Sequence, residues 1–185
     1  MRIIVAITGA SGIAYGVRLL EELRRAEAEV HLVVSEAAKK IMAYETDYEL
    51  AEVRKLSRET YREDDIAAAL ASGSFQYDGA VIVPCSLKTL AALARGYADN
   101  LITRMGLCAL KEGRRLVVVP RETPLDLASL RNLVAVRENG AVVLPAMPGF
   151  YHHPRGINEL VEYVVGKILD QLGIPHQLFE RWSGK

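Results

Sequence analysis

The chain is poor in cysteine, in net charge and in long apolar runs, and each shortage excludes a class of protein. Only two of its 185 residues are cysteines, Cys85 and Cys108, and their spacing fits no metal motif, so we expect reduced thiols. The 23 basic residues balance the 23 acidic residues, which argues against nucleic acid as a partner. No apolar run is long enough to span a bilayer and no signal peptide precedes the first apolar run, so we expect a cytoplasmic protein with no membrane partner.

Metal ligands are also scarce as patterns. The four histidines form no ligand spacing, and no aspartate-rich motif is present, so we expect no metal site. The sequence contains no internal repeat and no low-complexity segment. These observations leave a single globular domain of ordinary composition, large enough to bury a core without disulfides.

What the chain does have is a strong opening pattern. An apolar run over 2–7 is followed by the small residues Thr8-Gly9-Ala10-Ser11-Gly12 and then by helical spacing from Tyr15 to Leu23. This order predicts a buried parallel strand, a tight turn and a helix. Amides at the start of such a helix bind anions, so the turn predicts a site for a phosphate-bearing cofactor. The alternative is a ligand-free turn in which Ser11 caps the helix.

The turn does not match the dinucleotide fingerprint. With Gly9 as its first glycine, Ser11 and Ala14 stand where that fingerprint has its second and third glycines. The acidic residue expected after the next strand is also displaced, because Ser35 stands there and Glu36 follows. A mononucleotide therefore fits the turn better than a dinucleotide.

Apolar runs alternate with helical patterns along the rest of the chain. We predict strands over 30–34, 79–83, 115–119 and 141–144, with a short edge strand over 53–56. We predict helices over 35–42, 63–71, 90–97, 101–111, 125–136 and 157–172, the last one ending at Gly173. The alternation predicts one α/β domain over 1–185: a three-layer, Rossmann-like (flavodoxin-like) open parallel sheet with helices on both faces and a tail from about 173.

Polar residues follow several of these strands. Ser35 follows the second strand, Ser86 and Thr89 follow the strand over 79–83, and Arg121 and Glu122 lie between two prolines after the next one. Ligands of open α/β sheets bind beyond the carboxyl ends of the strands. We therefore expect a polar, cationic site at that edge of the sheet, although Arg121 and Glu122 could equally form a simple surface pair.

Two residues at this edge are possible nucleophiles. Ser11 has no histidine at a suggestive spacing, which disfavours a covalent serine mechanism. Cys85 is either a nucleophile or a small buried residue at a strand end, and the second role is the commoner one for a free cysteine.

Further polar residues lie on helices and in the late loop. Arg104, Lys111 and Lys167, taken singly, fit solvated helix faces. If they converge, they form a metal-free phosphate site. Tyr151, in a loop with three prolines over 145–154, either closes that site or packs under the loop.

Eight segments, in order, resemble the UbiX-like flavin prenyltransferases, a branch of the flavin-binding superfamily that also holds cysteine and phosphopantothenoylcysteine decarboxylases. The segments are Thr8–Gly12 with Tyr15-Gly16, Glu45-Thr46-Asp47, Pro84-Cys85-Ser86 with Thr89, Asn100-Leu101-Ile102 with Arg104, Ala109–Glu112, Pro120-Arg121-Glu122 with Pro124, Pro148–His152 with Pro154, and Ile174-Pro175 before Arg181-Trp182. The resemblance covers nearly the whole chain.

The resemblance implies an activity. A dimethylallyl group passes from dimethylallyl monophosphate to reduced FMN and closes a fourth ring between N5 and C6 of the flavin, without a metal. The product serves a separate UbiD-type decarboxylase, for example in ubiquinone biosynthesis. Relatives form homo-oligomers, namely dodecamers with sites between subunits.

The resemblance also implies residue roles. The FMN site comprises Gly9, Ala10, Ser11, Ser35, Ser86, Leu87, Lys88, Thr89 and Arg121. The prenyl phosphate site comprises Arg104, Lys111, Glu122, Tyr151 and Lys167, where the last position is Arg in some relatives. Ser11, Glu45 and Glu122 are the implied catalytic residues.

Two other functions stay open at this point. One is an FMN-dependent decarboxylase of the cysteine type, but that branch uses a histidine after the first strand and an asparagine in the late proline-methionine motif, where this chain has Ser11-Gly12-Ile13 and Pro145–Gly149. The other is a flavin-binding module without catalysis. Such a module has no need for Glu45, Glu122 and several remote cations.

Overall fold

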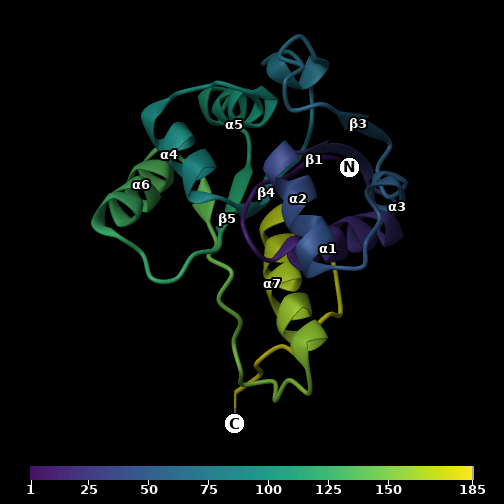
Figure 1. Ribbon diagram of the computed structural model, residues 1–185. Helices are drawn as coiled ribbons and strands as arrows, with labels where there is room; N and C mark the ends of the chain where they lie inside the picture. Colours follow the sequence, from purple (N-terminus) through teal and green to yellow (C-terminus); the bar gives the residue numbers. More distant parts are fainter. Residues whose placement is uncertain (185) are drawn as a thin grey trace.

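Six parallel strands form the central sheet of the computed structural model, which describes residues 1–184 (Figure 1). The strands are β1 (Arg2–Ile7), β2 (Glu29–Val34), β3 (Glu59–Tyr61), β4 (Gly79–Cys85), β5 (Leu116–Pro120) and β6 (Val142–Val143). Every pairing between them is parallel. The predicted fold class is therefore confirmed.

The strand order is β3-β2-β1-β4-β5-β6. With the three-residue edge strand β3 counted, this is the doubly wound order of dinucleotide-binding folds; without β3, the remaining five strands follow the flavodoxin-like order. In both descriptions the chain reverses direction across the sheet between β1 and β4. The carboxyl ends of these two strands therefore border the crevice in which open α/β sheets bind ligands.

Helices cover both faces of the sheet. They are α1 (Ile13–Arg25), α2 (Glu36–Glu45), α3 (Leu50–Arg54), α4 (Leu87–Arg95), α5 (Leu101–Lys111), α6 (Leu127–Glu138) and α7 (Ile157–Leu172), with a 3₁₀ turn, η1 (Ala69–Ala71). Side chains of β1 alternate between two cores: Ile3, Val5 and Ile7 pack with α1 and α7, whereas Ile4 and Ala6 pack with α4 and α5. Figure 1 shows the same division, with α4, α5 and α6 on one side and α1, α2 and α7 on the other.

Helix ends follow the sequence signals closely. Ser35 and Asn100 are N-caps, and each side chain accepts a hydrogen bond from the amide three residues later. Gly173 ends α7 in the left-handed conformation, with a φ of 73°. Among residues 1–184, no helix is both long and apolar enough to cross a membrane.

Two predicted elements between residues 53 and 71 are wrong. Residues 53–56 do not form the edge strand; they complete α3 and the turn after it, because Leu50, Val53 and Leu56 recur at helical spacing and face the core. The edge strand is β3 instead, where the Tyr61 hydroxyl lies 2.8 Å from Nδ1 of the buried His31.

The helix predicted over 63–71 is reduced to η1. Asp64 binds the guanidinium of Arg62, and the Asp65 carboxylate accepts a hydrogen bond from the amide of Ala67. Aspartates that bond neighbouring groups in this way compete with helix formation. Only the apolar end of the segment, near Leu70, is buried against the sheet.

Candidate active site

Thr8 joins the carboxyl ends of β1 and β4. Its amide and its hydroxyl both donate to the carbonyl of Pro84, at 3.2 and 2.7 Å, and its Oγ1 accepts from the amide of Ser86 at 2.8 Å. Because Thr8 is only 2% exposed, these bonds are shielded from water. The first turn and the turn after β4 therefore form one rigid wall of the crevice.

The first turn lies close to its neighbours, and its glycines make this possible. A Cβ on Gly9 would lie 2.5 Å from the Cβ of Ala37 in α2. Gly12 caps α1 with a φ of 100°, a left-handed conformation that favours glycine. The alternative in which Ser11 caps α1 is therefore wrong. The N-cap residue is Gly12, which has no side chain that could bond the first amides of the helix.

Glu45, the last residue of α2, occupies the start of α1. Its Oε2 accepts hydrogen bonds from the amide of Gly12 at 2.8 Å and from the amide of Ile13 at 3.3 Å. A carboxylate here complements the positive end of the helix dipole. The anion expected at the first amides of α1 is thus a side chain of the protein itself, which leaves the turn over 9–11 to face a ligand.

Glu45 is held in its ionised form. Partial burial opposes ionisation, but the neighbouring Ser11 hydroxyl, the amides of Gly12 and Ile13, and the charge of Arg121 outweigh it and lower the pKa of the carboxyl. A carboxylate with a hydroxyl at its side is an arrangement that can take up or relay a proton.

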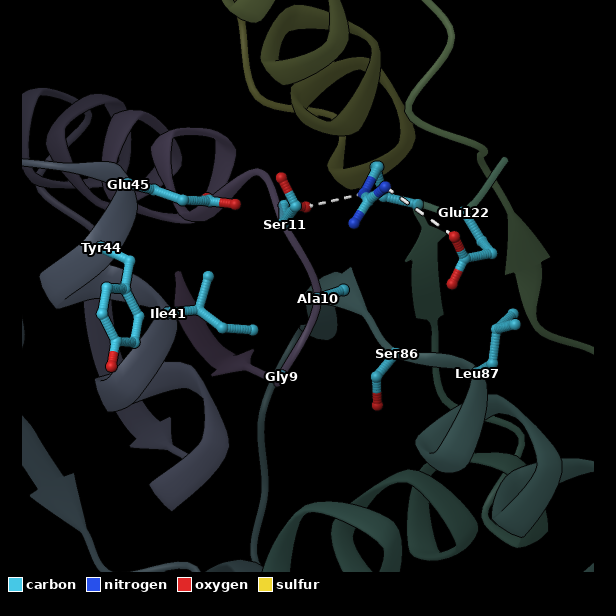
Figure 2. Close-up of a pocket in the computed structure, with 10 residues that line it drawn as sticks. Gly9, Ala10, Ser11, Ile41, Tyr44, Glu45, Ser86, Leu87 and Glu122 are labelled. Atoms are coloured by element: carbon cyan, nitrogen blue, oxygen red, sulfur yellow. Dashed lines mark hydrogen bonds and ion pairs between the residues drawn. The ribbon is translucent and has the colours of Figure 1, made fainter. Parts of the chain in front are cut away.

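Arg121 ties the end of β5 to the same turn. Its Nε donates to the carbonyl of Ser11 at 3.1 Å, and its Nη1 lies 3.9 Å from the Glu122 carboxylate (Figure 2). The remaining guanidinium nitrogens have donors left for a phosphate or a carbonyl. Arg121 therefore brings a fixed positive charge to the edge of the crevice.

These groups line a pocket of about 340 Å³. Figure 2 shows the Glu45 and Ser11 side chains on one side of it and Ser86, Leu87 and Glu122 on the other. The lining residues are Gly9, Ala10, Ser11, Ile41, Tyr44, Glu45, Ser86, Leu87, Arg121 and Glu122. All of them except Ile41 and Tyr44 belong to the site that the resemblance implies.

The sequence interpretation missed Ile41, Tyr44 and Thr8. Ile41 precedes Glu45 by one helical turn in α2. Tyr44 directly precedes Glu45 in the sequence and is 90% exposed. Once Glu45 is placed in the site, the i−4 spacing of Ile41 is the signal that could have found it. Thr8 gave no comparable signal, because its role depends on a pairing of β1 with β4.

Three residues of the implied FMN site lie at the same edge but outside the pocket lining. The Ser35 hydroxyl caps α2 by accepting from the amide of Ala38. Thr89 accepts a hydrogen bond from the Ser86 hydroxyl at 3.1 Å. Lys88 is paired with Asp99 at 3.3 Å, and its side chain is 75% exposed. Their contacts with FMN stay a prediction.

The implied prenyl phosphate residues are not brought together within one chain. Arg104 and Lys111 lie on α5, where Arg104 donates to the carbonyl of Ala71 and Lys111 lies near Glu112. Tyr151 lies in the loop before α7 and Lys167 on α7, a helix that covers the other face of the sheet from α5 (Figure 1). Only Glu122 of this set lines the pocket.

Cys85 is fully buried at the end of β4, and burial raises the pKa of its thiol to about 12. A thiol that stays protonated is a poor nucleophile. Its environment supports the packing role. No cluster of three or more His, Cys, Asp or Glu residues within 1–184 has the geometry of a metal site.

Fold and site together define a mononucleotide-binding α/β protein with a carboxylate and a hydroxyl side by side at its switch point. In agreement, the flavoprotein family model matches residues 1–169. The flavin prenyltransferase UbiX of Thermoplasma acidophilum is 49% identical over 98% of this chain and 100% of its own length. The chain belongs to this family, the UbiX-type flavin prenyltransferases.

Solved structures agree with this assignment. The crystal structure of AnUbiX (PadA1) in complex with FMN and dimethylallyl pyrophosphate has a TM-score of 0.97, is 46% identical, and covers 100% of this chain and 98% of its own. A dodecameric, FMN-dependent UbiX-like decarboxylase from Escherichia coli O157:H7 also has a TM-score of 0.97, at 44% identity over 100% of both chains. Family membership favours prenyl transfer over the cysteine-type decarboxylase and over a module without catalysis.

Proposed function

We propose that this chain transfers a dimethylallyl group from dimethylallyl monophosphate to reduced FMN, closing a ring between N5 and C6 of the flavin. The observation that carries the proposal is the placement of the ionised Glu45 carboxylate beside Ser11, in a pocket at the switch point of the sheet. An alkyl transfer needs a group that manages protons at the acceptor, and this pair lies where the acceptor would bind.

The residues present fit FMN. Hydroxyls of Ser11 and Ser86 and the guanidinium of Arg121 supply donors for carbonyl and phosphate oxygens, while Leu87 and Ile41 supply apolar surface for a ring system. Gly9, Ala10, Ser35, Lys88 and Thr89 complete the proposed FMN site. When bound, reduced FMN supplies the electron-rich N5 and C6 atoms that accept the prenyl group.

The donor is held through its phosphate. When the allylic C–O bond breaks, negative charge gathers on the leaving phosphate, and cations in a water-excluded site stabilise it. We assign this role to the cations Arg104, Lys111 and Lys167, with the Tyr151 hydroxyl as a further donor and with Glu122, which lies beside the Arg121 guanidinium, at the edge of the phosphate site. The released phosphate can itself take a proton from the acceptor.

This assignment requires more than one copy of the chain, because Arg104 and Lys111 lie on α5, whereas Tyr151 and Lys167 lie in the loop before α7 and on α7, which covers the other face of the sheet. An apolar face on α6 supports such an assembly. Leu127, Leu130 and Val134 are 61%, 45% and 57% exposed and share one side of the helix. We propose that a second copy covers this face, within a dodecamer like that of the E. coli neighbour.

The location of the protein and the use of its product in the cell are also part of the proposal. We place the protein in the cytoplasm, with a UbiD-type decarboxylase as recipient of its product and ubiquinone biosynthesis as one pathway served. The experiment that tests the central reaction is mass analysis of the flavin after anaerobic incubation with dimethylallyl monophosphate. An added prenyl unit is the expected result.

A further inference from the structure

The carboxyl-terminal tail, residues 174–184, lies along α7 (Figure 1). Gly166 of α7 makes room for it: a Cβ there would lie 2.5 Å from Cε1 of Phe179 and 2.6 Å from Cε1 of His176. The His176 side chain is only 1% exposed. The tail is therefore packed into a notch of the helix, at the residue next to Lys167.

Asp170, one turn further along α7, binds the tail by charge. Its carboxylate accepts two hydrogen bonds from Arg181, at 2.6 and 3.3 Å, and its Oδ1 lies 3.2 Å from Nε2 of His176. Two-point binding of a guanidinium fixes direction as well as distance. These contacts lower the pKa of the Asp170 carboxyl, first through the hydrogen bond of Arg181.

The same carboxylate also holds Lys167, whose Nζ lies 3.6 Å from Oδ2 of Asp170. A lysine ammonium on a flexible stem samples many positions unless a counter-charge restricts it. Lys167 is 43% exposed, and its pairing with Asp170 limits the positions that its ammonium can take.

The tail in turn contacts Tyr151. The Trp182 ring lies edge to face with the Tyr151 ring, with centroids 6.0 Å apart. The Tyr151 ring also packs edge to face with the ring of Tyr163 on α7, with centroids 5.8 Å apart. Tyr151 is therefore held between the helix and the tail that Asp170 fastens.

From these contacts we propose that Asp170 is a positioning residue. It fixes the position of the Lys167 ammonium directly, and it fixes the position of the Tyr151 hydroxyl indirectly, by fastening the tail that packs against Tyr151. The inference rests on the proposed function, in which both residues bind the prenyl phosphate. Asp170 is not part of the pocket lining, and its proposed contribution is to hold the phosphate-binding groups in place before the phosphate arrives.

The test compares Asp170→Asn with the parent enzyme in its assembled form. We expect the KM for dimethylallyl monophosphate to rise about tenfold, the size expected for losing one charge-assisted contact, with kcat nearly unchanged and FMN affinity unaltered. Trp182 is the only tryptophan of the chain, so its emission reports the tail. Trp182 is already 64% exposed but is restrained by its contact with Tyr151, so we expect its emission anisotropy to fall as the tail is released, with partial recovery in Asp170→Glu.

Gly166→Ala provides a second route to the same effect. Alanine favours the helix by about 1 kcal/mol over glycine, so the variant keeps α7 intact while its Cβ displaces the tail. The matched control is Glu162→Gln, on the same helix, which loses a 3.0 Å pair with Arg18 of α1 and leaves the tail untouched.

An unchanged KM in Asp170→Asn overturns the proposal, and so does a lower KM, which would mean that Asp170 competes with the phosphate for Lys167. Unaltered Trp182 emission anisotropy in both tail variants overturns it as well. If the parent enzyme makes no prenylated flavin, the proposed function fails, whereas the anisotropy change in the variants still supports the part of the inference that concerns the tail.

Discussion

Glu45 and Gly12 are 33 positions apart, yet Oε2 of Glu45 accepts a hydrogen bond from the Gly12 amide at 2.8 Å. The last side chain of α2 thereby caps α1. One carboxylate both stabilises the first turn and stands beside the Ser11 hydroxyl at the pocket. A change at Glu45 is therefore expected to affect both the stability of the fold and the proposed reaction.

Glu45→Gln should lower stability and activity together. The amide side chain still accepts a hydrogen bond but loses its charge at the helix start, at a cost of about 0.5 to 1 kcal/mol in unfolding free energy for this exposed group. Product formation should fall about a hundredfold. Urea unfolding and flavin mass analysis measure the two effects.

The difference in unfolding free energy between the parent protein and Glu45→Gln should decrease as the pH falls. The pKa of Glu45 is lowered in the folded state below its ordinary value of 4.5, so its ionised form stabilises the protein fully above that value. The advantage over Glu45→Gln should disappear as the pH falls through the folded-state pKa. A difference that stays constant from neutral to strongly acidic pH would show that the charge does not matter.

Ser11→Ala should separate binding from chemistry. Ser11 contributes its carbonyl to Arg121 whatever its side chain, so the turn keeps its shape in the variant. We expect product formation to slow about tenfold to a hundredfold while the Kd for FMN changes much less. Equal turnover in the two proteins would refute a chemical role for the hydroxyl.

Cys85 should be inert. Burial raises the pKa of the Cys85 thiol to about 12, so a thiol reagent at mildly alkaline pH should modify it only after unfolding. A Cys108→Ala background removes the other cysteine, so that labelling reports Cys85 alone. Cys85→Ala should cost about 1 to 2 kcal/mol of stability and leave the specific activity of the folded protein intact. Rapid labelling of the native protein would reveal a reactive thiol.

The apolar face of α6 should be needed for assembly. Placing charges on it with Leu130→Glu and Val134→Glu should give smaller particles by light scattering and little prenylation. The control is Ala128→Glu, an exposed position on another side of the same helix. An assembly unaffected by the paired charges would place the interface elsewhere.

Local patterns sufficed for much of the fold. The uninterrupted apolar runs and the Gly173 stop predict elements that the structure confirms. Prediction failed between residues 50 and 71, where Val53 packs into the core as part of a short helix and aspartates hold an irregular loop. Short elements depend on tertiary contacts, which a local pattern does not contain.

The residues of the site that follow strands could be predicted from the sequence, but those that depend on contacts between distant elements could not. Strand ends predict Ser11, Ser86 and Arg121 at one edge, because parallel strands all end there. The capping of α1 by Glu45 could not be predicted from spacing, since it depends on how α2 crosses the first turn. A convergence of Arg104 with Lys167 could not be predicted from local patterns either, because α5 and α7 cover opposite faces of the sheet in one chain.

The most direct test is the mass of the flavin. The purified protein is incubated without oxygen with reduced FMN and either dimethylallyl monophosphate or the diphosphate, and a parallel sample omits the protein. We expect a flavin heavier by one prenyl unit in the protein sample with the monophosphate, together with release of inorganic phosphate. Flavin of unchanged mass with both donors, in a protein that binds FMN, would contradict it.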